Sequence, residues 1–378
     1  MAKDMHKDLF DEATKLKLNI FGECFEEWLP VFNYNKYTER IIIFDLFAGS
    51  GTDVEGNPGS PLVFLDKAKG KDRKYCSNVK KFTQFLFNEA IKSKSEELRK
   101  NIEHHLNTCK ETNKCSSCKY SYMVENIDFK SFFSKPTVKS ILNDSKAAKF
   151  VLLDQYGFSE IDEGIFRELI SFPRTDFIFF IASSFISRFR EHPNTTKYID
   201  TTKINFKDIE PKEIHRAVAG YFRNLIPEDM EYYLHHFSIR KTPKKGNYYG
   251  LIFGSNHTLG MEKFLKVCWK HDPYSGEANY NIDNNWGEDS LFHKENKTIK
   301  KDNVQKDIKD AILSGRIVDN IEGLKYAMVK GCEPKLFTEV VKELEKTKEI
   351  ERIGDKNYSS TNIHKAKKYF IKRLKNGT

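Results

Sequence analysis

The chain has 378 residues and a net charge of +9, and 39% of its residues are hydrophobic, which is typical of a globular protein long enough for two domains. It has no apolar run of the roughly 18 residues that cross a membrane, and its polar N-terminal segment, residues 1–11, is no secretory signal. Its seven scattered cysteines argue against a secreted disulfide scaffold, and together these features predict a cytoplasmic protein.

Short apolar segments alternate with amphipathic ones through the first two thirds of the chain, as in a doubly wound α/β sheet. The predicted strands are residues 40–47, 82–87, 120–124, 150–153 and 176–182. The predicted helices are residues 21–32, 92–106 and 165–170, and one with Ser60 as its N-cap and Pro61 at its first helical position. Residues 232–240 and 248–253 then predict an antiparallel hairpin. A parallel sheet closed by such a hairpin is the methyltransferase variation on the Rossmann-like fold.

The last quarter of the chain shows a different order of elements. A helix over residues 260–270 and a polar linker over 271–301 precede three helical segments, residues 304–313, 321–329 and 335–345. Two strands, at residues 349–353 and around Tyr358, would follow. That order predicts a small winged helix-turn-helix. We therefore expect a Rossmann-like domain over residues 1–290, with a cysteine-containing insertion at about 104–120, and a basic domain over residues 300–378.

Most of the excess positive charge lies in this last segment. Residues 294–378 contain 21 Lys and Arg against 13 Asp and Glu, a balance of +8. A local basic excess favours a polyanionic partner, here nucleic acid. The predicted recognition helix, residues 335–348, and the lysines of the tail would contact phosphates. Two alternatives stay open: a lysine-rich solvated surface and a protein-docking module.

The turn after the first predicted strand is the strongest local signal for a ligand. Residues 45–51 read Asp-Leu-Phe-Ala-Gly-Ser-Gly, so an acid and a small-residue turn follow a buried strand. The turn lacks both the spacing of a dinucleotide loop and the Lys-Ser/Thr pair of a P-loop. Asp45 suits a cationic ligand, such as a sulfonium amino acid, and Gly49 and Gly51 would allow close approach of the backbone. The alternative is a tight turn that binds nothing.

Acids also follow the next predicted strands. Glu89 after the second strand would hold ribose hydroxyls, and Asp128 after the third would face an adenine. After the fourth strand, Asp154 would accept a hydrogen bond from a target amine, and Tyr156 would stack on a base. Asp154 and Tyr156 are the predicted catalytic pair. The predicted binding residues for S-adenosylmethionine (SAM) are Asp45, Phe47, Gly49, Gly51, Glu89 and Asp128.

Several of these motifs resemble the three-Cys-motif partner (TcmP) proteins, over roughly residues 14–270. The resemblance rests on residues 17–29, 45–51, 59–62, 154–157 and 172–176, and on His257 and Gly260. It implies a Rossmann-like SAM-dependent methyltransferase fold and a partner, a Gp37/Gp68-like protein similar to radical-SAM enzymes. The chain departs from the family's Asp-Pro-aromatic-Gly pattern at Gln155.

The chain also has a cysteine cluster of its own, Cys109, Cys115 and Cys118. Three thiolates within ten residues could bind zinc if Cys76 or a nearby histidine supplied a fourth ligand. The alternative is a reduced surface loop.

Three functions are therefore compatible with the sequence. The leading one is a SAM-dependent methyltransferase-like protein that acts on or with nucleic acid. The second is a non-catalytic partner of the radical-SAM-like protein. The third is a DNA-binding regulator that uses the C-terminal domain alone.

Overall fold

The computed structural model of the chain describes residues 9–115, 117–155, 159–204, 206, 209–241, 246–283, 291, 300–355 and 357–374. The chain divides into two compact units, residues 1–256 and 257–378, which we call the N-terminal unit and the C-terminal unit. Most of the second half of the predicted linker, residues 271–301, lies outside the described residues.

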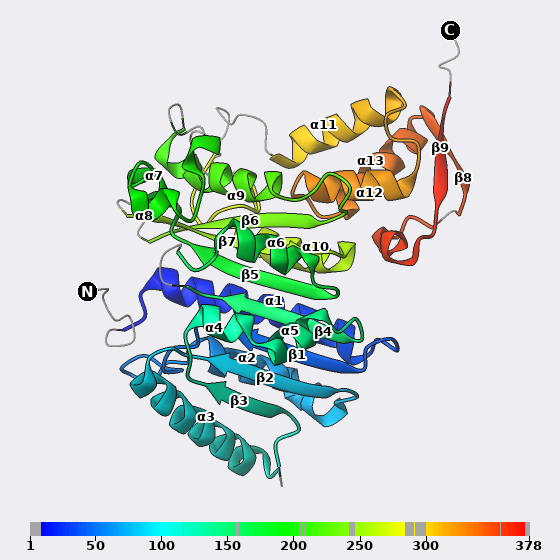
Figure 1. The fold of residues 1–378 in the computed structure, drawn as a ribbon. Coiled ribbons are helices and arrows are strands. Elements are labelled where there is room, and N and C mark those ends of the chain that lie inside the picture. The colour runs from blue at the N-terminus through cyan, green and yellow to red at the C-terminus, as the bar shows by residue number, and fades with distance from the viewer. Residues whose placement is uncertain are drawn as a thin grey trace. The chain divides into compact units, whose positions relative to one another are not determined.

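The N-terminal unit is built on one seven-stranded sheet (Figure 1), ordered β3-β2-β1-β4-β5-β7-β6. Its strands are β1 (Arg40–Asp45), β2 (Phe82–Asn88), β3 (Ser121–Glu125), β4 (Ala147–Leu153), β5 (Thr175–Ile181), β6 (Tyr233–Arg240) and β7 (Tyr248–Ser255). The first five strands are parallel, while β7 pairs antiparallel with both β5 and β6. The Rossmann-like methyltransferase sheet with a closing hairpin, which the sequence predicts, is confirmed.

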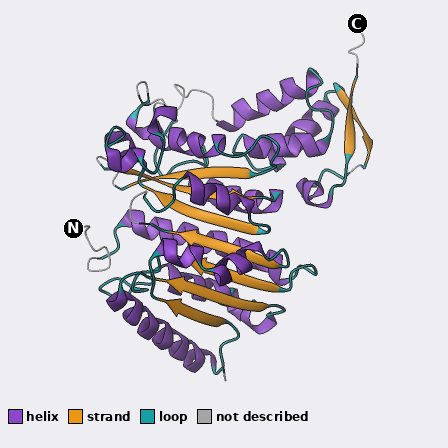
Figure 2. Cartoon of the chain, in the orientation of Figure 1, coloured by secondary structure: helices purple, strands orange, loops and turns teal. Residues whose placement is uncertain are grey.

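Helices connect these strands (Figure 2). They are α1 (Glu12–Asn33), α2 (Ser60–Lys69), α3 (Lys92–Asn113), α4 (Phe129–Ser134), α5 (Pro136–Asn143), α6 (Glu163–Ser171), α7 (Ser183–Arg188), α8 (Pro193–Thr196) and α9 (Ile214–Asn224). Helix α1 starts nine residues earlier than expected, because Asp11 caps it by accepting the Thr14 N–H. None of the described helices has both the length and the apolar character needed to cross a membrane.

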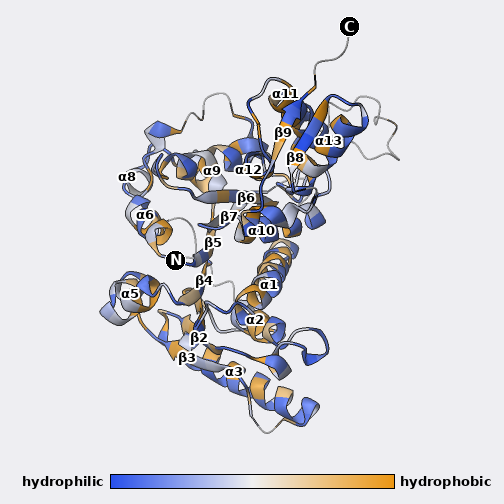
Figure 3. Ribbon diagram, turned by 90° about the vertical axis from the view of Figure 1, so that its right-hand side faces the viewer, coloured by the Kyte–Doolittle hydropathy of each residue, from blue (hydrophilic) through white to orange (hydrophobic). Residues whose placement is uncertain are grey.

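Aromatic side chains fill the space on both faces of the sheet. On one face, Phe25 and Trp28 of α1 pack with Phe64 of α2 and Phe150 of β4, at centroid distances of 5.1–6.2 Å. On the other face, α6 and α9 lie over β5: Phe166 contacts both Phe177 and Phe179, and Phe222 contacts Phe179. Hydrophobic residues accordingly follow the strands and the inner sides of the helices (Figure 3).

Polar side chains lock the amino edge of this sheet. Trp28 Nε1 donates to Asp176 Oδ2 at 2.6 Å, and burial raises the pKa of Asp176 to about 6. Arg174 donates to the Tyr37 carbonyl and to Thr38 Oγ1. The segment 172–176, which carries part of the family resemblance, therefore fastens β5 to α1 and to the start of β1.

The described residues of the C-terminal unit form four α-helices and a two-stranded antiparallel sheet. The elements are α10 (Thr258–His271), α11 (Lys300–Leu313), α12 (Asn320–Val329), α13 (Lys335–Lys346), β8 (Ile350–Gly354) and β9 (Tyr369–Arg373). The expected strand around Tyr358 is wrong, because β9 pairs with β8 instead. Residues 369–373 form the second strand because Tyr369 and Ile371 alternate toward the buried face of the hairpin. The Tyr358 ring instead packs against Arg352, whose guanidinium lies 3.5 Å from the ring centroid.

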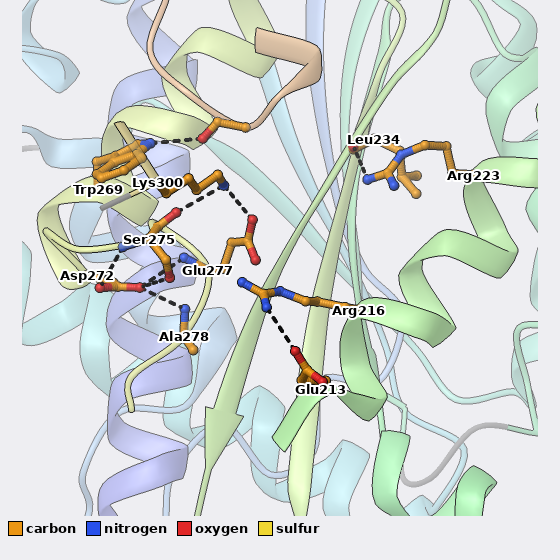
Figure 4. Close-up of polar contacts among 11 residues, drawn as sticks. Glu213, Arg216, Arg223, Leu234, Trp269, Asp272, Ser275, Glu277, Ala278 and Lys300 are labelled. Atoms are coloured by element: carbon orange, nitrogen blue, oxygen red, sulfur yellow. Dashed lines mark hydrogen bonds and ion pairs between the residues drawn. The ribbon is translucent and has the colours of Figure 1, made fainter. Parts of the chain in front are cut away.

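A loop after α10 is organised around the buried carboxylate of Asp272 (Figure 4). Its Oδ1 accepts the N–H groups of Tyr274 and Ser275, and its Oδ2 accepts those of Glu277 and Ala278 and the Ser275 hydroxyl. Lys300 at the start of α11 donates to the Ser275 carbonyl and pairs with Glu277. These contacts tie α10 to α11 although most of the chain between them lies outside the described residues.

Packing across the closing hairpin gives a test of the fold. A Cβ added at Gly250 of β7 would lie 1.6 Å from Cε1 of the buried His215, so we expect Gly250→Ala to destabilise the N-terminal unit by about 1–3 kcal/mol or more. Gly220 of α9 has open space at its Cβ, so Gly220→Ala should raise stability by up to about 1 kcal/mol. Urea denaturation of the full chain measures both; a Gly250→Ala protein as stable as wild type would contradict the packing.

Candidate functional site

The chain leaves β1 at Asp45 and turns toward α2 at the carboxyl edge of the sheet. The Leu46 N–H donates to the Leu152 carbonyl at 3.1 Å, and the Ala48 N–H donates to the Asn88 carbonyl at 2.9 Å. The turn is thus fastened to the ends of both β4 and β2. Gly49 has a φ of 62°, in the left-handed region that favours glycine. Ligands of doubly wound sheets bind at this edge.

Gly51 has a different role from the one that the sequence predicts. A Cβ at this position would lie 2.8 Å from Cδ1 of Leu98, which belongs to α3. The space beside Gly51 is therefore taken by α3 rather than left for a ligand. The same turn is tightened at Gly59, whose N–H donates to the Gly51 carbonyl at 2.7 Å.

Asp45 lies fully buried at the base of this turn. Its Oδ1 accepts the Phe47 N–H at 3.4 Å, and the Ser60 hydroxyl also hydrogen-bonds the carboxyl. Within the described part of the chain, its Oδ2 has no hydrogen-bond partner. Burial raises the pKa of Asp45 to about 7, and the negative charges of Asp154 and Glu89 add to this rise. The carboxyl therefore exchanges its proton near neutral pH.

Glu89 connects the glycine turn to the segment that follows β2. Its Oε2 accepts the Gly49 N–H at 2.9 Å, and its Oε1 accepts the Ile91 N–H at 2.8 Å. Each oxygen keeps a further lone pair with which it could bind hydroxyl groups. The carboxylate therefore shapes the turn, in addition to any contact with a ligand.

The side chains of Phe47 and Asp128 both contact α4. The Phe47 ring packs against Phe129 at a centroid distance of 5.0 Å. Asp128 is exposed and caps α4, because its Oδ1 accepts the Ser131 N–H at 2.9 Å. The hydrogen bond with Ser131 lowers the pKa of this carboxyl. Helix capping alone accounts for an acid at this position.

Asp154 follows β4 and forms a largely buried ion pair with Lys17 of α1. The Lys17 ammonium donates to both carboxylate oxygens, at 2.6 and 2.8 Å, and also lies 4.7 Å from the centroid of the Phe180 ring. The side chains of Lys17 and Asp154 are only 9% and 15% exposed. Asp154 therefore has a cationic partner already, so an acceptor group would have to share this carboxylate.

Gln155 departs from the family pattern and has a structural role. Its Nε2 donates to the Phe180 carbonyl at 3.2 Å, and its Oε1 accepts the Glu160 N–H at 2.9 Å. The amide thereby fixes the loop after β4 to the end of β5. Tyr156, the second predicted catalytic residue, lies outside the described residues.

The structure thus brings together three predicted acids, Asp45, Glu89 and Asp154, at the ends of neighbouring strands. Sequence reasoning missed Lys17 and assigned Ser60 to a helix cap, whereas Gly59 is the capping position and Ser60 hydrogen-bonds Asp45. A lysine on the apolar face of α1, between Ala13 and Phe21, is the signal that could have identified Lys17.

The predicted zinc site has no support. Among the described residues, no three His, Cys, Asp or Glu side chains are grouped to hold a metal ion. The guanidinium of Arg73 lies between thiols instead, donating to Cys115 Sγ at 2.8 Å, and its hydrogen bond with Cys76 raises the pKa of Arg73. The positive charge of Arg73 among these sulfur atoms would repel a zinc ion. Cys109 and Cys118 are likewise free thiols, the first half-buried and the second exposed.

Comparisons with known proteins assign no family to the chain. No family model and no curated protein match the chain, so the TcmP resemblance is not confirmed. A fibrillarin/Nop5p complex is similar at 12% identity and a TM-score of 0.30, over 67% of this chain and 90% of that one. A human methyltransferase 10 domain containing protein is similar at 11% identity and a TM-score of 0.28, over 62% of this chain and 82% of that one. TYW2 of P. horikoshii in complex with MeSAdo is similar at 12% identity and a TM-score of 0.28, over 67% of this chain and 66% of that one. TM-scores this low carry no argument, so the fold assignment rests on the strand order of the sheet.

The raised pKa of Asp45 makes stability depend on pH. Between pH 3.8 and about 7 the folded chain keeps a proton that the unfolded chain has lost, so the free energy of unfolding falls as the pH rises through this window. At about 1.36 kcal/mol per pH unit, the loss is at most about 4 kcal/mol. Asp45→Asn should therefore raise the free energy of unfolding more at pH 8 than at pH 5, as measured by urea denaturation.

The matched control is Asp128→Asn, because Asp128 is exposed and asparagine also caps helices. It should change stability little at either pH. An equal effect of Asp45→Asn at both pH values would show that the carboxyl does not hold its proton in the folded state.

Proposed function

We propose that the N-terminal unit binds SAM at the carboxyl edge of β1, β2 and β4, as a methyltransferase-like protein. The observation that carries this proposal is the buried Asp45 carboxyl with an unpartnered Oδ2. A buried oxygen without a donor costs free energy, and a cationic or hydrogen-bonding ligand would recover it. SAM carries both a sulfonium and an ammonium group.

The position of Asp45 in the sheet supports the same ligand. The strand order reverses between β1 and β4, and doubly wound sheets bind their ligands where the order reverses. Asp45 ends β1 and Asp154 follows β4, the two strands on either side of this point, and Glu89 follows β2. Acids at adjacent strand ends suit a ligand with cationic groups and ribose hydroxyls.

Each residue has a role in this proposal. Asp45 would face the cationic end of the ligand, Glu89 would accept ribose hydroxyls with its remaining lone pairs, and Asp128 would contact the base from the rim. Asp154, held by Lys17, would orient an acceptor beside the site. Bound SAM would supply an electrophilic methyl group. The chain would contribute mainly the positioning of the acceptor for in-line attack.

The C-terminal unit would add a nucleic-acid partner. Helices α11, α12 and α13 followed by the β8–β9 hairpin are arranged in the order of a winged helix, and an isolated bridge from Asp319 to Phe370 adds a third strand position to the hairpin. Its basic excess favours a polyanion. In this proposal the methyltransferase-like unit acts on or with nucleic acid.

One observation favours a second function. The Lys17–Asp154 pair and the structural role of Gln155 leave the expected amine-binding position altered. A chain that kept the fold without catalysis would then act as a partner of a radical-SAM-like Gp37/Gp68 protein.

SAM binding tests the main proposal by calorimetry. Asp45→Ala should weaken binding at least tenfold, about 1.4 kcal/mol, and the wild-type affinity should rise as the pH increases toward 7, because ionised Asp45 binds the cation. The control Asp310→Ala removes an exposed acid of α11 and should leave the affinity unchanged. An Asp45→Ala chain that binds like wild type would refute the site.

Catalysis and partnership separate in a second experiment. Labelled SAM incubated with the full chain and mixed cellular RNA and DNA should give labelled nucleic acid, and Asp154→Asn should reduce the yield. SAM binding without any transfer, together with a stable complex with the co-expressed radical-SAM-like protein, would favour the non-catalytic partner instead.

A further inference from the structure

The β8–β9 hairpin has one buried face and one face with exposed apolar side chains. Its register pairs Ile353 with Phe370 and Arg352 with Ile371. Ile350, Tyr369 and Ile371 are buried against the helices of the C-terminal unit. On the opposite face Ile353 is 49% exposed and Phe370 is 52% exposed. A two-stranded hairpin normally keeps polar side chains on its solvated face, so this apolar pair requires an explanation.

Two lysines lie beside this exposed pair, in a segment of the chain that is rich in positive charge. From residue 356 to the end, the chain has seven Lys and Arg and no Asp or Glu. Lys368 Nζ lies 5.0 Å from the centroid of the Phe370 ring and pairs with Asp319, and Lys372 pairs with Glu351 at 3.5 Å. Lys365 and Lys367 are exposed, and neither has an acidic partner in the described part of the chain. The hairpin therefore combines an exposed aromatic ring with a segment, just before it in the chain, whose lysines Lys365 and Lys367 are not neutralised by the described acids.

Helix α13, the predicted recognition helix, has no comparable surface. Its exposed side chains alternate in sign: Lys335, Glu339, Lys342, Glu343 and Lys346. Lys335 is paired with Glu333 at 2.7 Å, and the Lys342 ammonium lies 5.0 Å from the Tyr358 ring centroid. Carboxylates among the lysines repel phosphates, so this helix is a weak candidate for contact with a polyanion.

We infer that the exposed face of the β8–β9 hairpin binds single-stranded nucleic acid, with Phe370 stacked on an unpaired base, Ile353 beside it, and Lys365 and Lys367 on phosphates. An exposed ring flanked by lysines is the combination that binds single strands, because every unpaired base offers a face for stacking. A duplex covers its base faces and would leave the ring unused. The inference rests on the proposed nucleic-acid function and specifies where and in which form the nucleic acid binds.

Fluorescence anisotropy of the full chain with a labelled mixed-sequence single strand, DNA or RNA, tests the inference. Phe370→Ala should weaken binding about fivefold to 100-fold, whereas Phe370→Tyr should retain it. Lys365→Ala combined with Lys367→Ala should reduce the salt dependence, the slope of log affinity against log salt, by about 1.4. The matched control is Tyr37→Ala, which removes a 70% exposed ring that also has a lysine ammonium, that of Lys36, within 4.8 Å.

The other outcomes are distinguishable. Equal affinities of the Phe370→Ala and wild-type chains for a single strand would overturn the stacking site and leave the nucleic-acid function standing. A preference for duplex that is lost in Lys335→Ala and Lys342→Ala would assign binding to α13 and overturn the inference. If the wild-type chain binds neither form but still binds SAM, the inference and the nucleic-acid function both fail, while the proposal for the N-terminal unit stands.

Discussion

A carboxyl group without exposure to solvent, at the end of the central strand, is the constraint on which the carboxyl edge of the sheet depends. Asp45 lies near Ser60 and two further acids, and burial together with the negative charges of those acids raises its pKa to about 7. Lys17 balances Asp154, and two backbone amides bind Glu89. Asp154 and Glu89 therefore have partners for their carboxylates. Of the three acids, Asp45 alone has a buried oxygen, Oδ2, without a hydrogen-bond partner among the described residues.

The two edges of the large sheet are held together by different kinds of contact. At the amino edge, Trp28 and Arg174 join α1, β1 and β5 through direct side-chain contacts. At the carboxyl edge, the connections pass through turns and paired charges instead. Because contacts at the amino edge already hold the strands in register, the loops at the carboxyl edge can carry residues chosen for ligand binding rather than for stability. Helix α1 spans both edges, with Trp28 at one and Lys17 at the other.

Local signals in the sequence predict all seven strands of the large sheet, since a buried strand is an apolar run with polar residues at its ends. The acids after those strands are predictable for the same reason. The pair of Lys17 and Asp154 is not, because partners that are 137 residues apart leave no local pattern. The second strand of the C-terminal hairpin is not predictable either. Tyrosine is common in strands, but the Tyr358 ring packs against the Arg352 guanidinium instead. The short helices α4, α5, α7 and α8 were likewise missed, because segments of four to eight residues carry little periodicity. Helix α9 was missed although its buried residues Ile214, Val218 and Phe222 recur at helical spacing.

The ion pair between Lys17 and Asp154 also has a consequence for biosynthesis. During translation α1 emerges long before β4, and at roughly 5–20 residues per second the delay between the two partners is about 7 to 27 seconds. Throughout that interval the amphipathic α1 has neither its counter-charge nor the aromatic surface of β4 to cover it. A nascent chain of this protein would therefore expose a hydrophobic helix to chaperones until the fourth strand has left the ribosome.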